Sequence, residues 1–206
     1  IKHGANDFLR KPFLPEEFYC RVIHNIESLE LIEKITYNAQ RDHLTGLFHR
    51  PYFFNAAREI YRNAQEKSLP LACAVINVDK FSLINQHYGS AWGDIALKKI
   101  AASLQSMLGR FLLARADSDD FYVLMAGLDN EKAVALLDKV KQLLAAESFV
   151  IDGENKHFYF SAGVTNNLQS SIDQQIALAT KYMRRAKDAG GQMIVDDGDE
   201  DDDLGN

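Results

Sequence analysis

The sequence has no apolar run approaching the roughly 20 residues that a membrane-spanning helix needs. It also lacks a basic segment followed by an apolar core at its first residues, which is the pattern of a secretion signal. These two absences argue against a membrane or exported protein, and we expect a cytoplasmic one.

Cysteine is scarce: only Cys20 and Cys73 are present, and their separation matches none of the short spacings that build metal sites. We expect both to be reduced packing residues. Basic residues are also outnumbered, since 23 lysines and arginines against 29 aspartates and glutamates give a net charge of −6. Because nucleic-acid binding requires clustered basic side chains and the chain has no basic stripe, nucleic acid is excluded as a partner.

The composition is otherwise that of a globular protein, with 47% hydrophobic and 25% charged residues. A chain of 206 residues is long enough for one full domain and a smaller piece. We expect three parts: residues 1–40, a domain at 41–196, and a disordered acidic tail at 197–206. The acidic run from Asp196 to Asp203 supports the tail, because such runs stay solvated.

The first part is expected to contain one long helix, from Leu14 to about Gln40. Pro15 and the two glutamates that follow it suit a first helical turn. Apolar residues then recur every three or four positions, which predicts an amphipathic helix. This stripe fits either a coiled coil with a second copy of the chain or packing on the helix's own domain, and the pattern does not separate the two.

The second part alternates helices and strands, which indicates an α+β fold with helices packed on a central sheet. Residues 71–78 form a continuous apolar run typical of a central strand. Segments 111–115 and 120–126 flank a polar turn, as the strands of a hairpin do. Further strands are predicted at 149–151, 157–165 and 192–195, and helices at 51–65, 81–87, 92–108, 130–146 and 172–189.

Five segments of the chain carry a family resemblance. They are Asp42–Arg50 (DHLTGLFHR), Asn77–Asp94 (NVDKFSLINQHYGSAWGD), Arg115–Phe121 (RADSDDF), Ser161–Val164 (SAGV) and Arg185–Gly190 (RAKDAG). In order and spacing they resemble the motifs of the GGDEF family, the diguanylate cyclases of bacterial second-messenger signalling. The resemblance implies a nucleotidyl-cyclase-like fold, in which helices flank a mostly antiparallel central sheet, preceded here by the long linker helix.

The first thirteen residues, IKHGANDFLRKPF, resemble the end of a response-regulator receiver domain. That resemblance implies a last strand at Asp7–Arg10, a Lys11 that contacts a phosphoryl group, and a cis peptide between Lys11 and Pro12. It also implies an upstream sensor kinase as a partner. An unrelated strand followed by a helix is the alternative interpretation.

Diguanylate cyclases join two GTP molecules into cyclic di-GMP by phosphoryl transfer, to which the protein contributes metal ions and positioning. The cofactor that the resemblance implies for any bound nucleotide is Mg²⁺ or Mn²⁺. By the same resemblance, the metal positions are Asn77 and Asp119, the catalytic position is Asp120, and the nucleotide-binding positions are Asn85, Asp94 and Lys187.

Several positions depart from the family pattern. Asn77 lacks the charge of the usual aspartate, and the hairpin Asp117-Ser118-Asp119-Asp120-Phe121 carries an acid and a serine in place of two glycines. Ser82 and Gly191 stand where the family often has basic residues, and the product-inhibition motif RxxD is absent at 108–111. These changes predict weaker metal binding, an altered hairpin and less positive charge for phosphates.

We therefore interpret the chain as a degenerate GGDEF domain, a non-catalytic signalling or interaction module of a response regulator in cyclic di-GMP or two-component signalling. It is expected to form a homodimer through the linker helix. Two alternatives stay open. In the first, the chain is an active diguanylate cyclase, since Asp119 and Asp120 are acceptable at their positions. In the second, it is a sensor that binds GTP or a related guanine nucleotide without turnover. Asn85 and Asp94 favour the sensor, although both also suit helix caps or turns.

Overall fold

The computed structural model describes residues 7–151, 153–168 and 171–200. The chain divides into two compact units, Ile1–Arg41 and Asp42–Asn206, which are described separately below. The boundary lies one residue from the predicted start of the main domain. No helix among the described residues is both long and apolar enough to cross a membrane.

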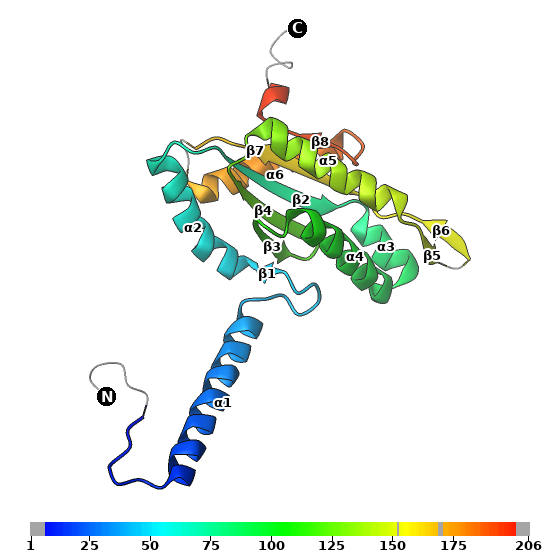
Figure 1. Ribbon diagram of the computed structural model, residues 1–206. Helices are drawn as coiled ribbons and strands as arrows, with labels where there is room; N and C mark the ends of the chain where they lie inside the picture. The colour runs from blue at the N-terminus through cyan, green and yellow to red at the C-terminus, as the bar shows by residue number, and fades with distance from the viewer. Residues whose placement is uncertain (1–6, 152, 169–170, 201–206) are drawn as a thin grey trace. The chain divides into compact units, whose positions relative to one another are not determined.

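The smaller unit consists of helix α1 (Pro15–Ala39) and the described segment before it (Figure 1). The helix lies where the apolar periodicity predicted it, and none of its residues is buried within the chain. Cys20 is therefore exposed, and its expected role as a packing residue is wrong. The peptide between Lys11 and Pro12 is cis, as the receiver resemblance implied.

The strand expected at Asp7–Arg10 is not formed. A strand is held by backbone hydrogen bonds to a neighbouring strand, and the described part of the smaller unit contains no other strand. Side chains hold this segment instead: Arg21 pairs with Asp7 at 3.0 Å and with Glu17 at 3.2 Å.

The larger unit is built on a six-stranded sheet with the strand order β1-β3-β4-β2-β7-β8. The outer pairs β1·β3 and β7·β8 are parallel and the three inner pairs are antiparallel, which confirms a mostly antiparallel sheet. The strands are β1 (Phe48–His49), β2 (Leu71–Val78), β3 (Leu112–Asp117), β4 (Asp120–Ala126), β7 (Phe160–Thr165) and β8 (Ile194–Val195).

Helices cover both faces of this sheet (Figure 1). Alternate residues of β2 explain the arrangement: Ala72, Ala74 and Ile76 belong to one core with α4 and α5, whereas Cys73 and Val75 belong to a second core with α2 and α6. Both faces of β2 are thus buried, as its continuous apolar run predicted. The helices are α2 (Arg50–Glu66), α3 (Phe81–Tyr88), α4 (Ser90–Leu108), α5 (Asn130–Ala146) and α6 (Ile172–Asp188).

Short elements account for the differences from the predicted pattern. Strand β1 has two residues and is defined by its pairing with β3, a long-range contact that local periodicity does not reveal. The strand predicted at 157–165 begins only at Phe160, and the preceding Glu154–Lys156 is a separate strand, β6, paired with β5 (Phe149–Ile151). In the intervening segment the Tyr159 carbonyl accepts a hydrogen bond from Asp79 N instead of joining a ladder.

The ordered chain also continues past the predicted boundary at 196, because Asp197–Glu200 form a 3₁₀ turn. The Asp197 carboxylate accepts hydrogen bonds from Asn130 Nδ2 at 2.9 Å and from Thr165 Oγ1 and Asn166 N at 3.0 Å. These contacts hold the start of the acidic run against the domain. Residues 201–206 of the predicted tail lie outside the described residues.

Candidate functional site

The end of β2 and the β3–β4 hairpin form the first half of the candidate site. Pairing of β2 with β4 places Asn77 opposite Asp120, and pairing with β7 places it opposite Ser161. Asn77 is only 7% exposed, so its amide must find partners within the protein. Phe121, the last residue of the family motif, is fully buried in the core and anchors the start of β4.

Asn77 links two charged side chains. Its Nδ2 donates to Asp120 Oδ1 at 2.6 Å, and its Oδ1 accepts a short hydrogen bond from Lys187 Nζ of α6. One carboxamide therefore bridges an ammonium and a carboxylate, using both of its polar ends. After the role that the family resemblance implies, we call Asn77, Asp119, Asp120 and Lys187 the phosphate side of the site.

The environment of Asp120 raises the pKa of its carboxyl group above the usual value. Burial is the main cause, and the neighbouring charges of Asp119 and Asp117 act in the same direction. The hydrogen bond from Asn77 and the charge of Lys187 oppose the rise only in part. The carboxylate of Asp120 is thus harder to ionise than an exposed aspartate.

These residues do not fit the pair of divalent metal ions that the family resemblance implies. Hard cations require several anionic oxygens, but Asn77 supplies a neutral amide whose oxygen already accepts from the Lys187 ammonium. Among the described residues, no group of three or more His, Cys, Asp and Glu side chains could hold a metal ion. At the end of β2, where the family has an aspartate, the neutral side chain of Asn77 contacts the Lys187 ammonium.

The hairpin turn is held by arginines from two directions. Arg50 of α2 pairs with Asp117 at 2.8 Å. Arg115 donates to the Ser118 carbonyl at 2.9 Å from Nε and pairs with Asp42 at 3.1 Å. Ser118 has φ 26°, in the left-handed region that disfavours residues with a side chain, so these contacts hold a conformation that the family's glycines adopt readily.

Asp42, at the entry to the domain, is the acidic partner in this network. Burial alone would raise the pKa of its carboxyl group, but hydrogen bonds from Thr45 and Arg115 outweigh burial and lower it. The side chains of Arg115 and Asp42 are 16% and 24% exposed, so this pair is better shielded than Arg50 and Asp117 at 49% and 62%. The sequence analysis used Asp42, Arg50 and Arg115 only to recognise motifs, and it did not predict that their ion pairs and hydrogen bonds stabilise the turn.

The sequence analysis also did not predict that Asp79 connects three segments of the chain by hydrogen bonds. Its two carboxylate oxygens accept from Ser161 Oγ and from the Gln192 backbone N–H, both at 2.8 Å. The turn that contains Gln192 has positive φ at three consecutive residues, Gly190, Gly191 and Gln192. Asp79 therefore ties the end of β2 to β7 and to the turn before β8, and Gly191 lies so close that an added Cβ would meet Asp79 Oδ1 at 3.2 Å.

A hollow of about 300 Å³ adjoins this turn and the phosphate side. Its lining includes Lys187, Lys80 and His157, together with Ile84 of α3 and Gln192. Two cationic side chains, one histidine and Asp79 thus border the hollow. Helix α3, which carries Asn85, meets the phosphate side here.

The second half of the site, which we call the base side, consists of Asn85, Gly93 and Asp94. Asn85 lies inside α3 and Asp94 inside α4, so neither is a helix cap or a turn residue. The Oδ1 atom of Asn85 is buried and has no hydrogen-bond partner among the described residues. A Cβ added to Gly93 would lie 1.9 Å from this oxygen, so a larger residue at position 93 would displace the end of the Asn85 side chain.

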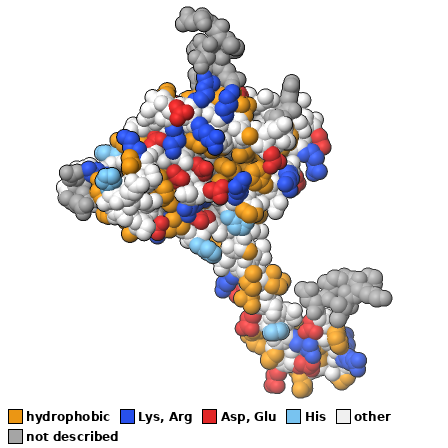
Figure 2. All heavy atoms as spheres, turned by 180° about the vertical axis from the view of Figure 1, so that it is seen from behind, with side chains coloured by type: hydrophobic (Ala, Val, Ile, Leu, Met, Phe, Trp, Pro, Cys, Tyr) orange, Lys and Arg blue, Asp and Glu red, His pale blue; other side chains and the backbone are white. Residues whose placement is uncertain are grey.

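The predicted site residues of the larger unit thus fall into these two sides, and Lys11 belongs to the smaller unit. Ser82 is exposed on α3, and Gly191 contributes backbone only. Figure 2 shows acidic and basic side chains interspersed over the visible face of the larger unit.

This arrangement of helices on both faces of a mostly antiparallel sheet, with an acidic hairpin at the strand ends, defines a nucleotidyl-cyclase-like domain. A family model described as "Diguanylate cyclase, GGDEF domain" matches residues 39–193. The chain therefore belongs to the GGDEF family.

The curated relatives include enzymes and a response regulator. The probable diguanylate cyclase DgcT of Escherichia coli is 28% identical over 187 residues, which cover 86% of this chain and 39% of that protein. The response regulator PleD of Caulobacter vibrioides is 26% identical over 207 residues, which cover 95% of this chain and 46% of that protein. The chain spans less than half the length of each of these two relatives.

A solved structure of the coiled coil and GGDEF domain of DgcB from Caulobacter crescentus, in complex with c-di-GMP, has the same fold. The TM-score is 0.80 at 18% sequence identity, with coverage of 88% of this chain and 98% of that one. At this identity the likeness shows the fold alone.

Proposed function

We propose that this chain is a non-catalytic GGDEF module that transmits a signal in cyclic di-GMP or two-component signalling by its conformation and contacts. The observation that carries the proposal is the Asn77 amide, which joins the Lys187 ammonium to the Asp120 carboxylate. A cyclase needs this position as an anionic metal ligand, because hard cations bind weakly to neutral oxygens.

The hairpin turn supports the same proposal. Asp117 adds a negative charge where the family has glycine. The ion pair with Arg50 at 2.8 Å compensates part of this charge, and the remainder opposes a phosphate. The loss of a metal ligand and the added charge act on one catalytic unit, and the remaining members of such a unit do not restore its activity.

The decisive test is incubation of the purified protein with GTP and either Mg²⁺ or Mn²⁺, followed by chromatography for cyclic di-GMP and pyrophosphate. We expect no product from the native chain. Product that disappears in Asp119→Ala would establish an active diguanylate cyclase and overturn the proposal.

Direct metal binding gives a second readout that does not depend on turnover. Free Mn²⁺ is measured by electron paramagnetic resonance during titration with the native chain and with Asn77→Asp. We expect at least about tenfold tighter binding to the variant, because a carboxylate replaces a neutral amide. Equal affinities would remove Asn77 as the cause of the metal defect.

We further propose that the module belongs to a response regulator controlled by a sensor kinase and dimerises through α1. The alignment with PleD covers 95% of this chain, so it includes α1. The apolar residues Val22, Ile26 and Leu29 of α1 are 38%, 50% and 55% exposed in the single chain, which suits a coiled-coil seam. Light scattering tests this proposal, and a monomer mass at every concentration would contradict it.

A second candidate function, a guanine-nucleotide sensor, is favoured by the buried Oδ1 of Asn85, which has no partner among the described residues. Buried polar atoms are rarely left without a hydrogen bond, and a guanine base has N–H groups to donate. A sensor should show a rise in melting temperature with guanosine or GTP, but not with ATP, because ligands of the native state stabilise it.

Two variants on α3 test whether the guanine-dependent rise in melting temperature depends on Asn85. Asn85→Ala should lose the guanine-dependent rise, and Gln86→Ala, an exposed neighbour, should keep it. A rise that ATP reproduces, or that Asn85→Ala retains, would reject the sensor.

A further inference from the structure

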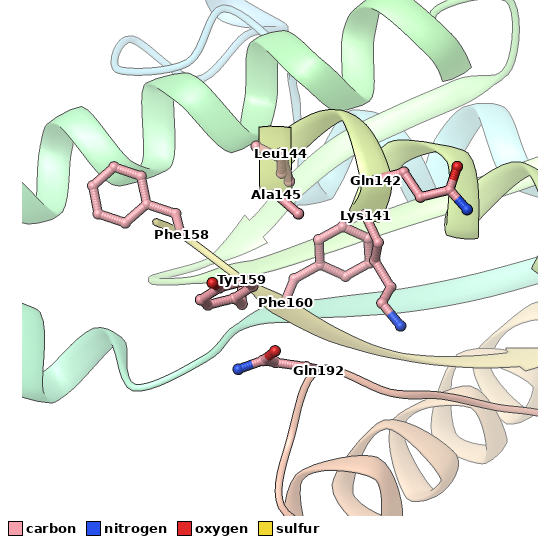
Figure 3. Close-up of a pocket in the computed structure, with 8 residues that line it drawn as sticks. All are labelled: Lys141, Gln142, Leu144, Ala145, Phe158, Tyr159, Phe160 and Gln192. Atoms are coloured by element: carbon pink, nitrogen blue, oxygen red, sulfur yellow. The ribbon is translucent and has the colours of Figure 1, made fainter. Parts of the chain in front are cut away.

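A separate pocket of about 250 Å³ lies between α5, the segment 158–160 and the turn before β8 (Figure 3). Leu144 and Phe160 form an apolar floor and are each only 1% exposed. Lys141, Gln142, Tyr159 and Gln192 contribute the polar groups of the lining. Figure 3 shows these side chains arriving from three separate elements of the fold.

The polar groups of this pocket are available to a ligand. No hydrogen bond within the described residues is formed by the Tyr159 hydroxyl or by the carboxamides of Gln142 and Gln192. Lys141 has one ion pair, with Asp138 at 3.6 Å, and the Asp138 side chain is 50% exposed. Such an exposed pair within one helix is weak, so the ammonium can turn to another anion.

We propose that this pocket binds a small aromatic anion, a single substituted ring that carries a carboxylate. Apolar pockets with a few convergent polar groups are the usual form of small-molecule sites. A cavity of about 150 Å³ is enough to accept benzene, so the volume suits one ring with its substituent. The ring packs against Leu144 and Phe160, and the carboxylate meets Lys141 and the Gln192 amide.

The pocket is coupled to the phosphate side through Gln192. Gln192 lines both this pocket and the hollow beside Lys187, and its backbone N–H donates to Asp79 at 2.8 Å. Tyr159 also lines both, and its carbonyl accepts from Asp79 N at 2.9 Å. A ligand that orders Gln192 is therefore connected through its backbone to Asp79 at the end of β2.

Amide chemical shifts of the 206-residue chain during titration with benzoate test the proposal. Benzamide serves as the neutral probe of the same shape. A ligand of this size should bind with a dissociation constant on the order of 1 mM. We expect saturable shifts along α5 and at residues 158–160, and the same binding curve at the amides of Gln192 and Asp79.

Two pairs of variants on α5 separate pocket binding from surface effects. Ala145→Phe fills the pocket and should abolish binding, whereas Ala135→Phe, also on an exposed position of α5, should leave it unchanged. Lys141→Met should weaken benzoate about threefold, the effect of one partly exposed charge pair, without changing benzamide. Lys139→Met, exposed on the same helix, should change neither.

The absence of saturable shifts at concentrations about tenfold above the expected constant would overturn the site. Retention of binding in folded Ala145→Phe, shown by an otherwise native spectrum, would do the same. Binding that leaves the Gln192 and Asp79 amides unmoved would overturn the coupling. These outcomes are independent of cyclase activity and of metal binding.

Discussion

The base side and the phosphate side of this domain are held together by different means. On the base side, α4 approaches the Asn85 side chain so closely that a Cβ at position 93 would displace it. On the phosphate side, side chains hold one another, through the chain of contacts from Lys187 to Asn77 and Asp120 and through the arginines at the hairpin turn.

This difference explains why the family pattern is kept on one side and altered on the other. A residue required by close packing cannot change without moving its neighbours. A residue held by hydrogen bonds can be exchanged for another of similar size if its partners are still satisfied. Asn77 has the size of the family's aspartate and satisfies both of its partners, yet it removes the charge on which a metal site depends. The sheet thus tolerates a substitution that, under the proposed function, weakens metal binding.

The largest expected effect concerns the brace of the hairpin. Arg115→Met should lower the free energy of unfolding by about 2 kcal/mol, because it removes the donor of the Ser118 carbonyl and the charged partner of Asp42, which keeps only its hydrogen bonds from Thr45. Urea denaturation followed by circular dichroism measures this loss. Arg50→Met is the matched control and should cost less than about 0.5 kcal/mol, since its pair with Asp117 is exposed.

Acid sensitivity sharpens the same prediction. The native fold lowers the pKa of Asp42, so this carboxylate contributes stability above its unfolded pKa of about 4 and loses it as the pH falls through the folded value. Arg115→Met should therefore lose less stability than the native chain on acidification. Equal costs for the two arginine variants would show that the turn is not braced by Arg115.

The next effect concerns the base side. If the chain is the guanine-nucleotide sensor of the second proposal, Gly93→Ala should weaken guanosine binding at least about tenfold, because the new Cβ displaces Asn85 Oδ1. Its cost in stability should be about 1 kcal/mol, because the atom it displaces is the end of a side chain that can turn away. Calorimetric titration with guanosine measures the binding constant, and urea denaturation measures the stability.

A double-mutant cycle tests the physical reason for this loss. In an Asn85→Ala background the Gly93→Ala change should have no further effect on binding, because the group that it displaces is already absent. Additive losses would show that Gly93 acts on the base side by some route other than Asn85.

The sequence predicted the frame of this domain better than the contacts within its site. Strand β2 was predicted at its exact residues, because both of its faces are buried and its run is continuously apolar. Motif spacing also singled out Asn77 and Asp120, which the structure joins by a hydrogen bond. The bond from Lys187 to Asn77 and the brace from Arg115 to Asp42 join residues 110 and 73 positions apart, and neither periodicity nor spacing carries information about such pairs.

The smallest expected effect isolates the charge of Asp120. Asp120→Asn keeps an oxygen that can accept from Asn77 Nδ2 and removes the carboxylate whose ionisation burial opposes. Since the native fold raises this pKa, the folded state holds more protons than the unfolded state above pH of about 4, and this group makes the native chain less stable as the pH rises. The variant should therefore be more stable at neutral pH, by less than about 1 kcal/mol because the group is partly exposed.

The advantage of Asp120→Asn should vanish below pH of about 4, where the native carboxyl group is neutral in both states. Urea denaturation at a series of pH values measures the difference. A variant that is less stable at neutral pH would mean that the ionised carboxylate gains more from Asn77 and Lys187 than it loses by burial. In that case the phosphate side would be stabilised by its charges, and the raised pKa assigned to Asp120 would be wrong.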